Sequence, residues 1–253
     1  MSNYQSNEPQ YFGSQSMTQT FSHPMFAADA EESERIGFIR RTYSHLAGAI
    51  LAFVLLETLV INVVAPMVGV NTVMGWFGGY NMLIFMGAFI AVSYLAQSWA
   101  SSGSSSAMQY AGLGLYVVFE TVFFLPILLI ATHYYPGAIE AAGITTLAIF
   151  GGLTAFVFIT KTDFSFLRSL LMIGSLAAVA MIVASIFLGG GLGIWFSGGM
   201  IFLASGYILY DTSNVLHKYR TDQHVAASLA LFASVALLFY YILRFVMDMT
   251  SRD

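Results

Sequence analysis

The chain contains no cysteine and very few charged residues. Only 9% of its 253 residues are Asp, Glu, Lys or Arg, whereas soluble domains carry about 25%. The absence of cysteine excludes disulfides, thiolate nucleophiles, and iron–sulfur or zinc–thiolate sites. A net charge of −4 without a basic cluster excludes a nucleic-acid-binding protein. Because 58% of the residues are hydrophobic, too many for one soluble core, we expect an integral protein of the lipid bilayer.

Long apolar runs follow residue 37 and are separated by short polar or glycine-containing turns. A helix needs about 20 mainly apolar residues to cross a bilayer, and seven segments approach this length: 43–66, 78–99, 107–131, 139–160, 166–188, 194–216 and 225–246. The sequence therefore predicts an all-α membrane protein with seven transmembrane helices in residues 37–253. Residues 1–36 are polar and acidic, and we expect a mobile cytoplasmic tail there.

The basic residues predict the orientation of the chain in the membrane. If the N-terminus is cytoplasmic, seven of the nine Lys and Arg residues lie on the cytoplasmic side: Arg35, Arg40, Arg41, Lys161, Arg168, Lys218 and Arg220. Arg244 and Arg252 lie on the other side. Since basic residues concentrate in cytoplasmic loops, we predict a multi-pass protein with a cytoplasmic N-terminus and an external C-terminus.

Three acidic residues fall within the predicted spans: Glu57, Glu120 and Asp211. An ionisable group at this depth costs at least about 2.5 kcal/mol, which makes each acid a candidate for binding or gating ions or protons. At 1.5 Å per residue, Glu57 and Glu120 lie ~20 Å from the cytoplasmic ends of their helices, and Asp211 lies ~7 Å away. His45 shares the depth of Asp211 and is a candidate partner. The alternative is that the acids are protonated, hydrogen-bonded structural residues.

Segment 194–216 repeats triplets of small or polar residues at heptad spacing: Ser197-Gly198-Gly199, Ala204-Ser205-Gly206 and Asp211-Thr212-Ser213. Small residues let membrane helices approach closely, so this helix is expected to be an inner one, with Asp211 facing protein or water. The sequence contains no H-E-x-x-H motif, and Lys161 and Lys218 lie in loops. We therefore expect neither enzymatic activity nor a cofactor, and no metal site can be assigned.

Four segments carry a family resemblance. Residues Ser205-Gly206-Tyr207-Ile208-Leu209-Tyr210-Asp211-Thr212-Ser213-Asn214 resemble the signature of the Bax inhibitor-1 (TMBIM) family. Phe38–Tyr43, Glu120–Pro126 and Lys161–Leu167 resemble three further segments of that family, in the same order. The resemblance covers about residues 37–246 and is strongest to the bacterial YccA-like branch.

This resemblance implies a fold and two alternative functions. The implied fold has seven helices, with helix 7 central between two three-helix groups. The first function is a pH-sensitive calcium leak or cation exchange gated by two aspartates, of which Asp211 matches the first and Ser234 falls near the place of the second. The second is that of a substrate or regulator of a membrane protease such as FtsH, engaged through the N-terminal tail. The branch implies a bacterial inner membrane.

Overall fold

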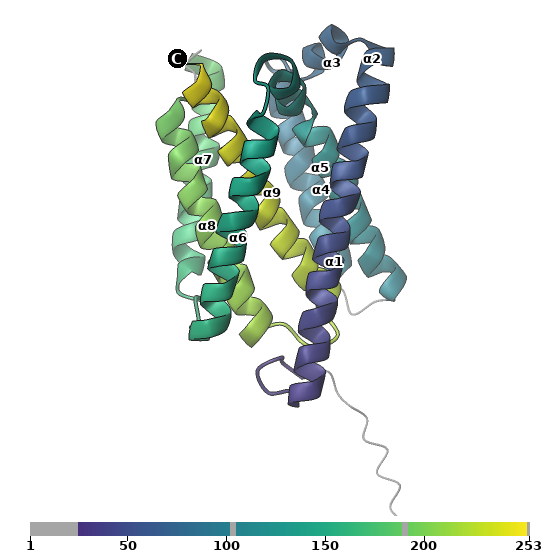
Figure 1. The fold of residues 1–253 in the computed structure, drawn as a ribbon, viewed down its shortest axis with the longest axis vertical. Coiled ribbons are helices and arrows are strands. Elements are labelled where there is room, and N and C mark those ends of the chain that lie inside the picture. Colours follow the sequence, from purple (N-terminus) through teal and green to yellow (C-terminus); the bar gives the residue numbers. More distant parts are fainter. Residues whose placement is uncertain (1–24, 102–104, 189–191, 252–253) are drawn as a thin grey trace, which may run out of the picture.

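The computed structural model describes residues 25–101, 105–188 and 192–251. The bundle consists of α1 (Glu32–Leu59), a π-helical turn (Val60–Val64), α2 (Ala65–Val68), α3 (Val70–Trp76), α4 (Asn81–Ser101), α5 (Ser106–Tyr134), α6 (Ala138–Thr160), α7 (Leu167–Leu188), α8 (Ile194–His217) and α9 (His224–Thr250). The long helices run roughly along one axis (Figure 1). Part of the predicted tail, residues 1–24, lies outside the described residues.

Six helical stretches are long and apolar enough to cross a membrane: Glu32–Val68, Asn81–Ala100, Ser106–Tyr134, Ala138–Thr160, Leu167–Leu188 and His224–Thr250. They correspond to six of the seven predicted segments, and within the described residues the predicted all-helical membrane fold is confirmed. The seventh segment forms α8, which has 24 residues but is not among these six stretches. Its small and polar residues make it less apolar than its neighbours.

The first long helix begins earlier than its apolar segment. Hydropathy places the start near residue 43, whereas α1 begins at Glu32. Two acids in its first turn, Glu32 and Glu34, interact favourably with the positive end of the helix dipole. The helix therefore extends about three turns beyond the apolar segment.

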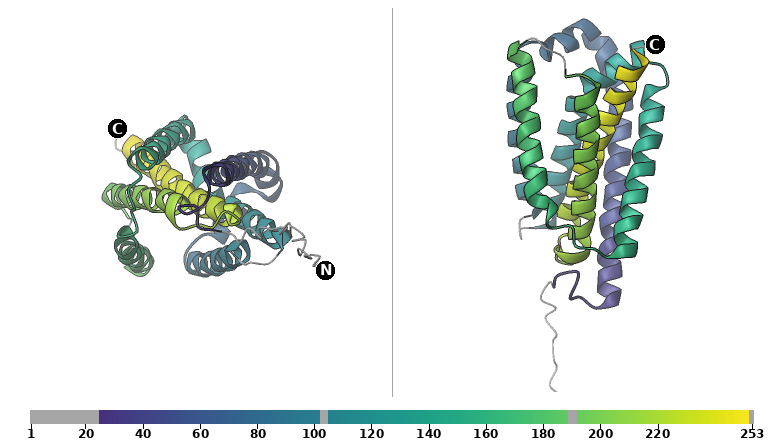
Figure 2. Two further views of the ribbon diagram at one scale, coloured as in Figure 1. Left: turned by 90° about the horizontal axis from the view of Figure 1, so that it is seen from below. Right: turned by 90° about the vertical axis from the view of Figure 1, so that its left-hand side faces the viewer.

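Helix α9 lies at the centre of the bundle. It packs against α1, α4, α5, α6 and α8, and more of it is buried than of any other candidate span. The end-on view in Figure 2 shows it crossing the middle of the bundle. Its buried residues include several small ones (Ala226, Ala227, Ser228, Ser234 and Ala236), which permit close approach by the surrounding helices.

The predicted close packing of α8 is confirmed. A Cβ atom at Gly206 would lie 2.9 Å from Leu171 Cδ2, and one at Gly174 would lie 2.7 Å from Leu203 Cδ1. Both contacts join α7 to α8. Ala204 and Ser213 of α8 are fully buried, so this helix is an inner one, as its small residues indicate.

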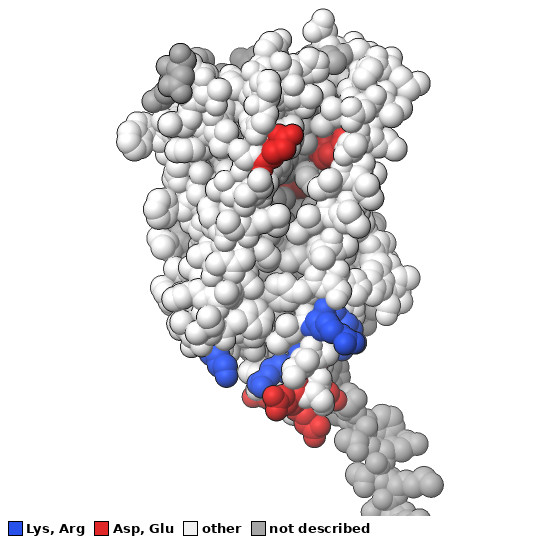
Figure 3. Space-filling view, in the orientation of Figure 1, with Lys and Arg blue, Asp and Glu red and all other residues white. Residues whose placement is uncertain are grey.

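Lys and Arg side chains gather at one end of the molecule, the lower end in Figure 3. This end, called the basic end below, contains the start of α1, the α6–α7 connection and the α8–α9 loop. Arg244 lies far along α9, toward the opposite end. The bundle therefore has a strongly asymmetric distribution of positive charge.

Candidate functional site

A cavity of about 550 Å³ lies inside the bundle and contains two of the three predicted acids, Asp211 and Glu120, in its wall. Residues of α4, α5, α7, α8, α9 and the α8–α9 loop line it. Six tyrosines contribute to the lining: Tyr116, Tyr207, Tyr210, Tyr219, Tyr240 and Tyr241. The sequence did not predict that these tyrosines line a cavity, because they come from different elements and are not related by a regular spacing along the chain.

Asp211 is held between α8 and α9. Its side chain is only 8% exposed, and Ser234 Oγ of α9 donates a hydrogen bond of 2.5 Å to its Oδ2 atom. Ser234 is itself buried and lines the same cavity. The structure therefore places Ser234 directly against the predicted gate residue.

Two of the segments that carry the family resemblance meet at the basic end. Ser213 Oγ, two residues after Asp211, accepts a hydrogen bond of 2.9 Å from the backbone N–H of Phe164. Asp163 Oδ1 accepts bonds from the hydroxyl and the backbone N–H of Ser165. These bonds hold the pKa of Asp163 below its usual value. The α6–α7 connection is thus fastened to the turn of α8 that carries Asp211.

Glu57 and Glu120 form a second acidic region, between α1 and α5. Their side chains are 5% and 4% exposed, and the two carboxyl groups are close enough to interact electrostatically. Both carboxyl oxygens of Glu57 and Oε2 of Glu120 lack a hydrogen-bond partner among the described residues. Buried carboxyl groups without partners stay protonated or require a cation.

His45 lies in a different place from Asp211. Its Nδ1 atom donates to the carbonyl of Arg41 at 2.6 Å, and its Nε2 atom is 3.1 Å from Tyr110 Oη. The same hydroxyl lies 3.5 Å from His224 Nε2. His45 and Tyr110 line a groove between α1 and α5, whereas Asp211 lines the central cavity. In the described parts of the chain, no contact joins His45 to Asp211.

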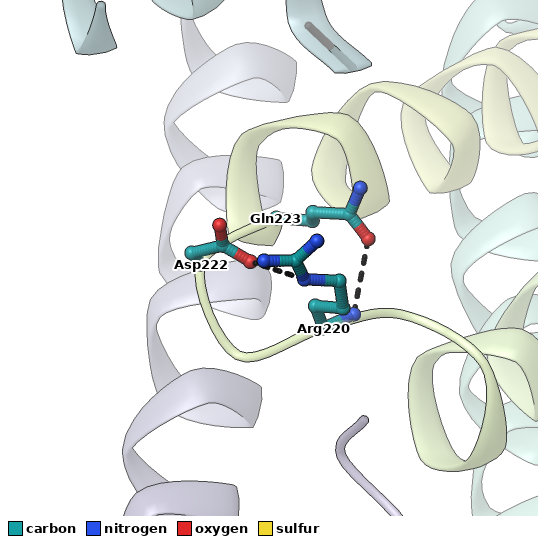
Figure 4. A network of polar contacts seen from close by, with 3 residues as sticks. All are labelled: Arg220, Asp222 and Gln223. Carbon is teal, nitrogen blue, oxygen red and sulfur yellow. Dashed lines mark hydrogen bonds and ion pairs between the residues drawn. The ribbon is translucent and has the colours of Figure 1, made fainter. Parts of the chain in front are cut away.

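The basic-end boundary of the cavity is formed by the α8–α9 loop, whose Tyr219 lines it. Residues 25–30, called the strap below, bind this loop: Ala27 N–H donates to Tyr219 O at 2.8 Å, and Thr221 N–H donates to Met25 O at 3.1 Å. Figure 4 shows how the loop is braced by an Arg220–Asp222 ion pair of 3.5 Å and a 3.0 Å bond from Arg220 N–H to Gln223 Oε1. No feature of the sequence predicted this contact between the strap and the α8–α9 loop.

Six apolar spans, one of which is the central buried helix α9, and an interior cavity with two acids in its wall define a multi-span α-helical membrane protein. Within the described residues, no group of three or more His, Asp or Glu side chains could hold a metal ion. Residues 35–252 match the family model described as "Inhibitor of apoptosis-promoting Bax1". The match spans most of the chain, which therefore belongs to the Bax inhibitor-1 family.

Similar proteins occur in bacteria and in yeast. A Helicobacter pylori protein is 26% identical over 225 residues, which are 88% of this chain and 91% of that protein. The Escherichia coli "Modulator of FtsH protease YccA" is 34% identical over 109 residues, 43% of this chain and 49% of that protein. The Schizosaccharomyces pombe "Bax inhibitor 1" is 32% identical over 124 residues, 48% of this chain and 47% of that protein.

Proposed function

We propose that this protein is a pH-sensitive cation leak or exchanger that admits calcium through the central cavity. The observation that carries the proposal is the presence of Asp211 and Glu120 in the wall of one cavity. Along α9 the lining extends from Ala230 to Tyr241, or roughly 17 Å. This is more than half of a hydrocarbon core of about 30 Å.

The cavity offers oxygen ligands, which calcium prefers. Calcium binds six to eight oxygens and accepts carboxylates, carbonyls and water. Asp211 and Glu120 supply carboxylates, and the tyrosine hydroxyls and Asn214 supply further polar groups. Because the side chains provide only part of a complete ligand set, water completes the coordination in this proposal. A weakly bound ion suits passage better than storage.

Asp211 is the proposed gate. When it is protonated, it is neutral, and the adjoining cavity stays poorly hydrated. When it ionises, its charge draws water and cations into the half of the cavity nearest the basic end. This hydration opens a route toward Glu120. Glu57, on α1, interacts electrostatically with Glu120 on the neighbouring helix α5 and is the proposed continuation of this route.

The test is calcium flux into liposomes that contain the purified protein, measured from pH 5 to pH 8. Asp211→Asn mimics the protonated state and should fix one permeability at every pH, and Glu120→Gln should reduce flux. Glu140→Gln is the matched control, because Glu140 is an exposed acid outside the cavity. A pH-dependent flux that survives in Asp211→Asn would show that another group senses the proton.

We further propose that α8 is the seventh span and that the basic end faces the cytoplasm of a bacterium, with the protein in the inner membrane. Two observations support this. Helix α8 packs between α6, α7 and α9 like a bundle member, and basic residues gather at one end. Reporter fusions at Ser251 should report an external C-terminus, and a cytoplasmic signal there would contradict the topology.

A second candidate function is regulation of a membrane protease such as FtsH, through the N-terminal tail. It is favoured by the similarity to the Escherichia coli protein named as a modulator of FtsH protease. Deleting residues 2–24 should prolong the cellular half-life of the protein in cells that contain the protease. An unchanged half-life would remove this candidate, and absence of flux in all variants above would favour it.

A further inference from the structure

A groove of about 640 Å³ lies between α1 and α5 and is separate from the central cavity in its lining residues. Its volume falls in the range typical of small-molecule sites, about 300–1,000 Å³. Most of its lining is apolar or small, including Ala52 and Leu56 on α1 and Val118 on α5. From Ser44 to Leu56 it extends about 18 Å along α1, a length close to one leaflet of the hydrocarbon core.

Two glycines show that no helix fills this groove. Gly48 of α1 and Gly114 of α5 both line it, and a Cβ atom built on either would meet no described heavy atom within 4 Å. Glycines in membrane helices commonly permit close helix packing, as Gly206 does against Leu171. Gly48 and Gly114 instead leave open space between the two helices.

The end of the groove nearest the basic end is polar. His45 and Tyr110 line it, and His224 of α9 contacts both rings. On α1, Arg40 lies one helical turn before Ser44, and Arg41 lies one turn before His45. Each arginine is therefore on the same face of the helix as a residue that lines the groove. Polar aromatic rings and basic side chains mark the headgroup level of a membrane helix.

The neighbouring charges favour an anion at this end. The acid on the adjoining loop, Asp222, is paired with Arg220, whereas Arg40 and Arg41 form no ion pair in the described parts of the chain. A ligand that matches the groove combines an acyl chain, about one leaflet long, with a negatively charged phosphate headgroup.

We propose that the α1–α5 groove binds one anionic phospholipid, with an acyl chain along Gly48 and Gly114 and its phosphate near Arg40 and Arg41. Tyr110 and His45 then set the depth of the headgroup. The lipid would fill the space that the two glycines leave and would join α1 to α5 from the membrane side.

The test uses the purified full chain in detergent, with bound lipid counted by native mass spectrometry and affinity taken from thermal shifts. Phosphatidylglycerol should bind and raise the Tm, phosphatidylcholine should do so much less, and inorganic phosphate alone should have no effect. Equal effects of the two lipids, or a full effect of phosphate alone, would overturn the proposal.

Gly48→Leu should fill the groove and abolish the phosphatidylglycerol shift. Gly114→Leu fills the opposite wall and serves if the first variant does not fold. The matched control is Gly151→Leu on α6, where a Cβ atom also meets nothing within 4 Å. Lipid binding that persists in both groove variants, or that Gly151→Leu also abolishes, would contradict the site.

The headgroup contacts are tested by charge. The double substitution Arg40→Gln/Arg41→Gln should weaken phosphatidylglycerol binding about 25-fold and leave phosphatidylcholine unchanged. Lys161→Gln/Arg168→Gln removes two charges at the same end but on other elements, and should retain the preference. If light scattering instead shows a dimer that Gly48→Leu dissociates, a second copy of the chain occupies the groove and the proposal fails.

Discussion

Ser234 Oγ donates a 2.5 Å hydrogen bond to Asp211 Oδ2 and thereby joins α9 to α8 inside the cavity. The family resemblance places a second aspartate near this position in channel-like members. A serine can donate a hydrogen bond to an ionised Asp211, whereas a second carboxylate would repel it unless one proton is shared. In this chain Asp211 is paired with a hydrogen-bond donor, so the gate, as proposed, depends on one titrating group.

Removing the donor should destabilise the protein. In Ser234→Ala a buried carboxylate loses its hydrogen bond, which costs about 1–3 kcal/mol. The measurement is thermal denaturation in detergent, with a double-mutant cycle that adds Asp211→Asn. The control is Ser185→Ala, because among the described residues the Ser185 hydroxyl bonds to the carbonyl of Ile182 in its own helix and not to another helix. Additive effects of the two substitutions would show that the bond contributes nothing.

The sequence could predict the helices and the acids but not how they meet. Asp211 and Glu120 were recognisable because an acid in an apolar run is rare, and both line the cavity. That one cavity joins them could not be predicted, since it depends on the packing of α4, α5, α7, α8 and α9. A role for Ser234 could be predicted only from the family resemblance. Hydropathy also misplaced the start of α1, because this helix begins with polar residues that precede its apolar segment.

Substitution of Glu57 tests whether this residue has a structural role or belongs to the proposed ion route. Both its carboxyl oxygens are buried without a described hydrogen-bond partner, so an apolar residue of similar shape should fit at lower cost. Glu57→Met is expected to stabilise the protein by about 1–3 kcal/mol and to reduce calcium flux. A stabilised variant with full flux would remove Glu57 from the proposed ion route, and a destabilised one would reveal a partner for its carboxyl group.

The strap should contribute to stability independently of the residues before it. Deleting residues 2–24 should leave the Tm unchanged, whereas deleting residues 2–30 also removes two backbone hydrogen bonds to the α8–α9 loop and the fully buried Ala27. At about 0.5–1.5 kcal/mol for each bond, the larger deletion should cost about 1–3 kcal/mol. Equal Tm values for the two deletions would show that docking of the strap is energetically unimportant.

Asp163 should make stability depend on pH in the acidic range. Because its pKa in the folded protein is lowered by the bonds from Ser165, folding favours the ionised form. This contribution is complete above the ordinary Asp pKa of about 3.9 and is lost as the pH falls below it. The Tm difference between wild type and Asp163→Asn should therefore be present at pH 6 and shrink steadily as the pH falls below about 4. Ser165→Ala should reduce this pH dependence, and Asp29→Asn should leave it unchanged.

Two glycines of α5 provide a test of the helix packing itself. A Cβ atom at Gly112 would lie 2.6 Å from the backbone oxygen of Ala96 and 2.9 Å from the backbone nitrogen of Ala100 in α4. Backbone atoms cannot rotate away, so Gly112→Ala must separate α4 from α5, and such overpacking costs about 1–3 kcal/mol or more. At Gly114 a Cβ atom meets nothing within 4 Å, and alanine there should stabilise the helix by up to about 1 kcal/mol. Thermal denaturation of the two variants should thus give shifts of opposite sign. Shifts of the same sign would contradict the close contact of α4 with α5 and the open groove beside α1.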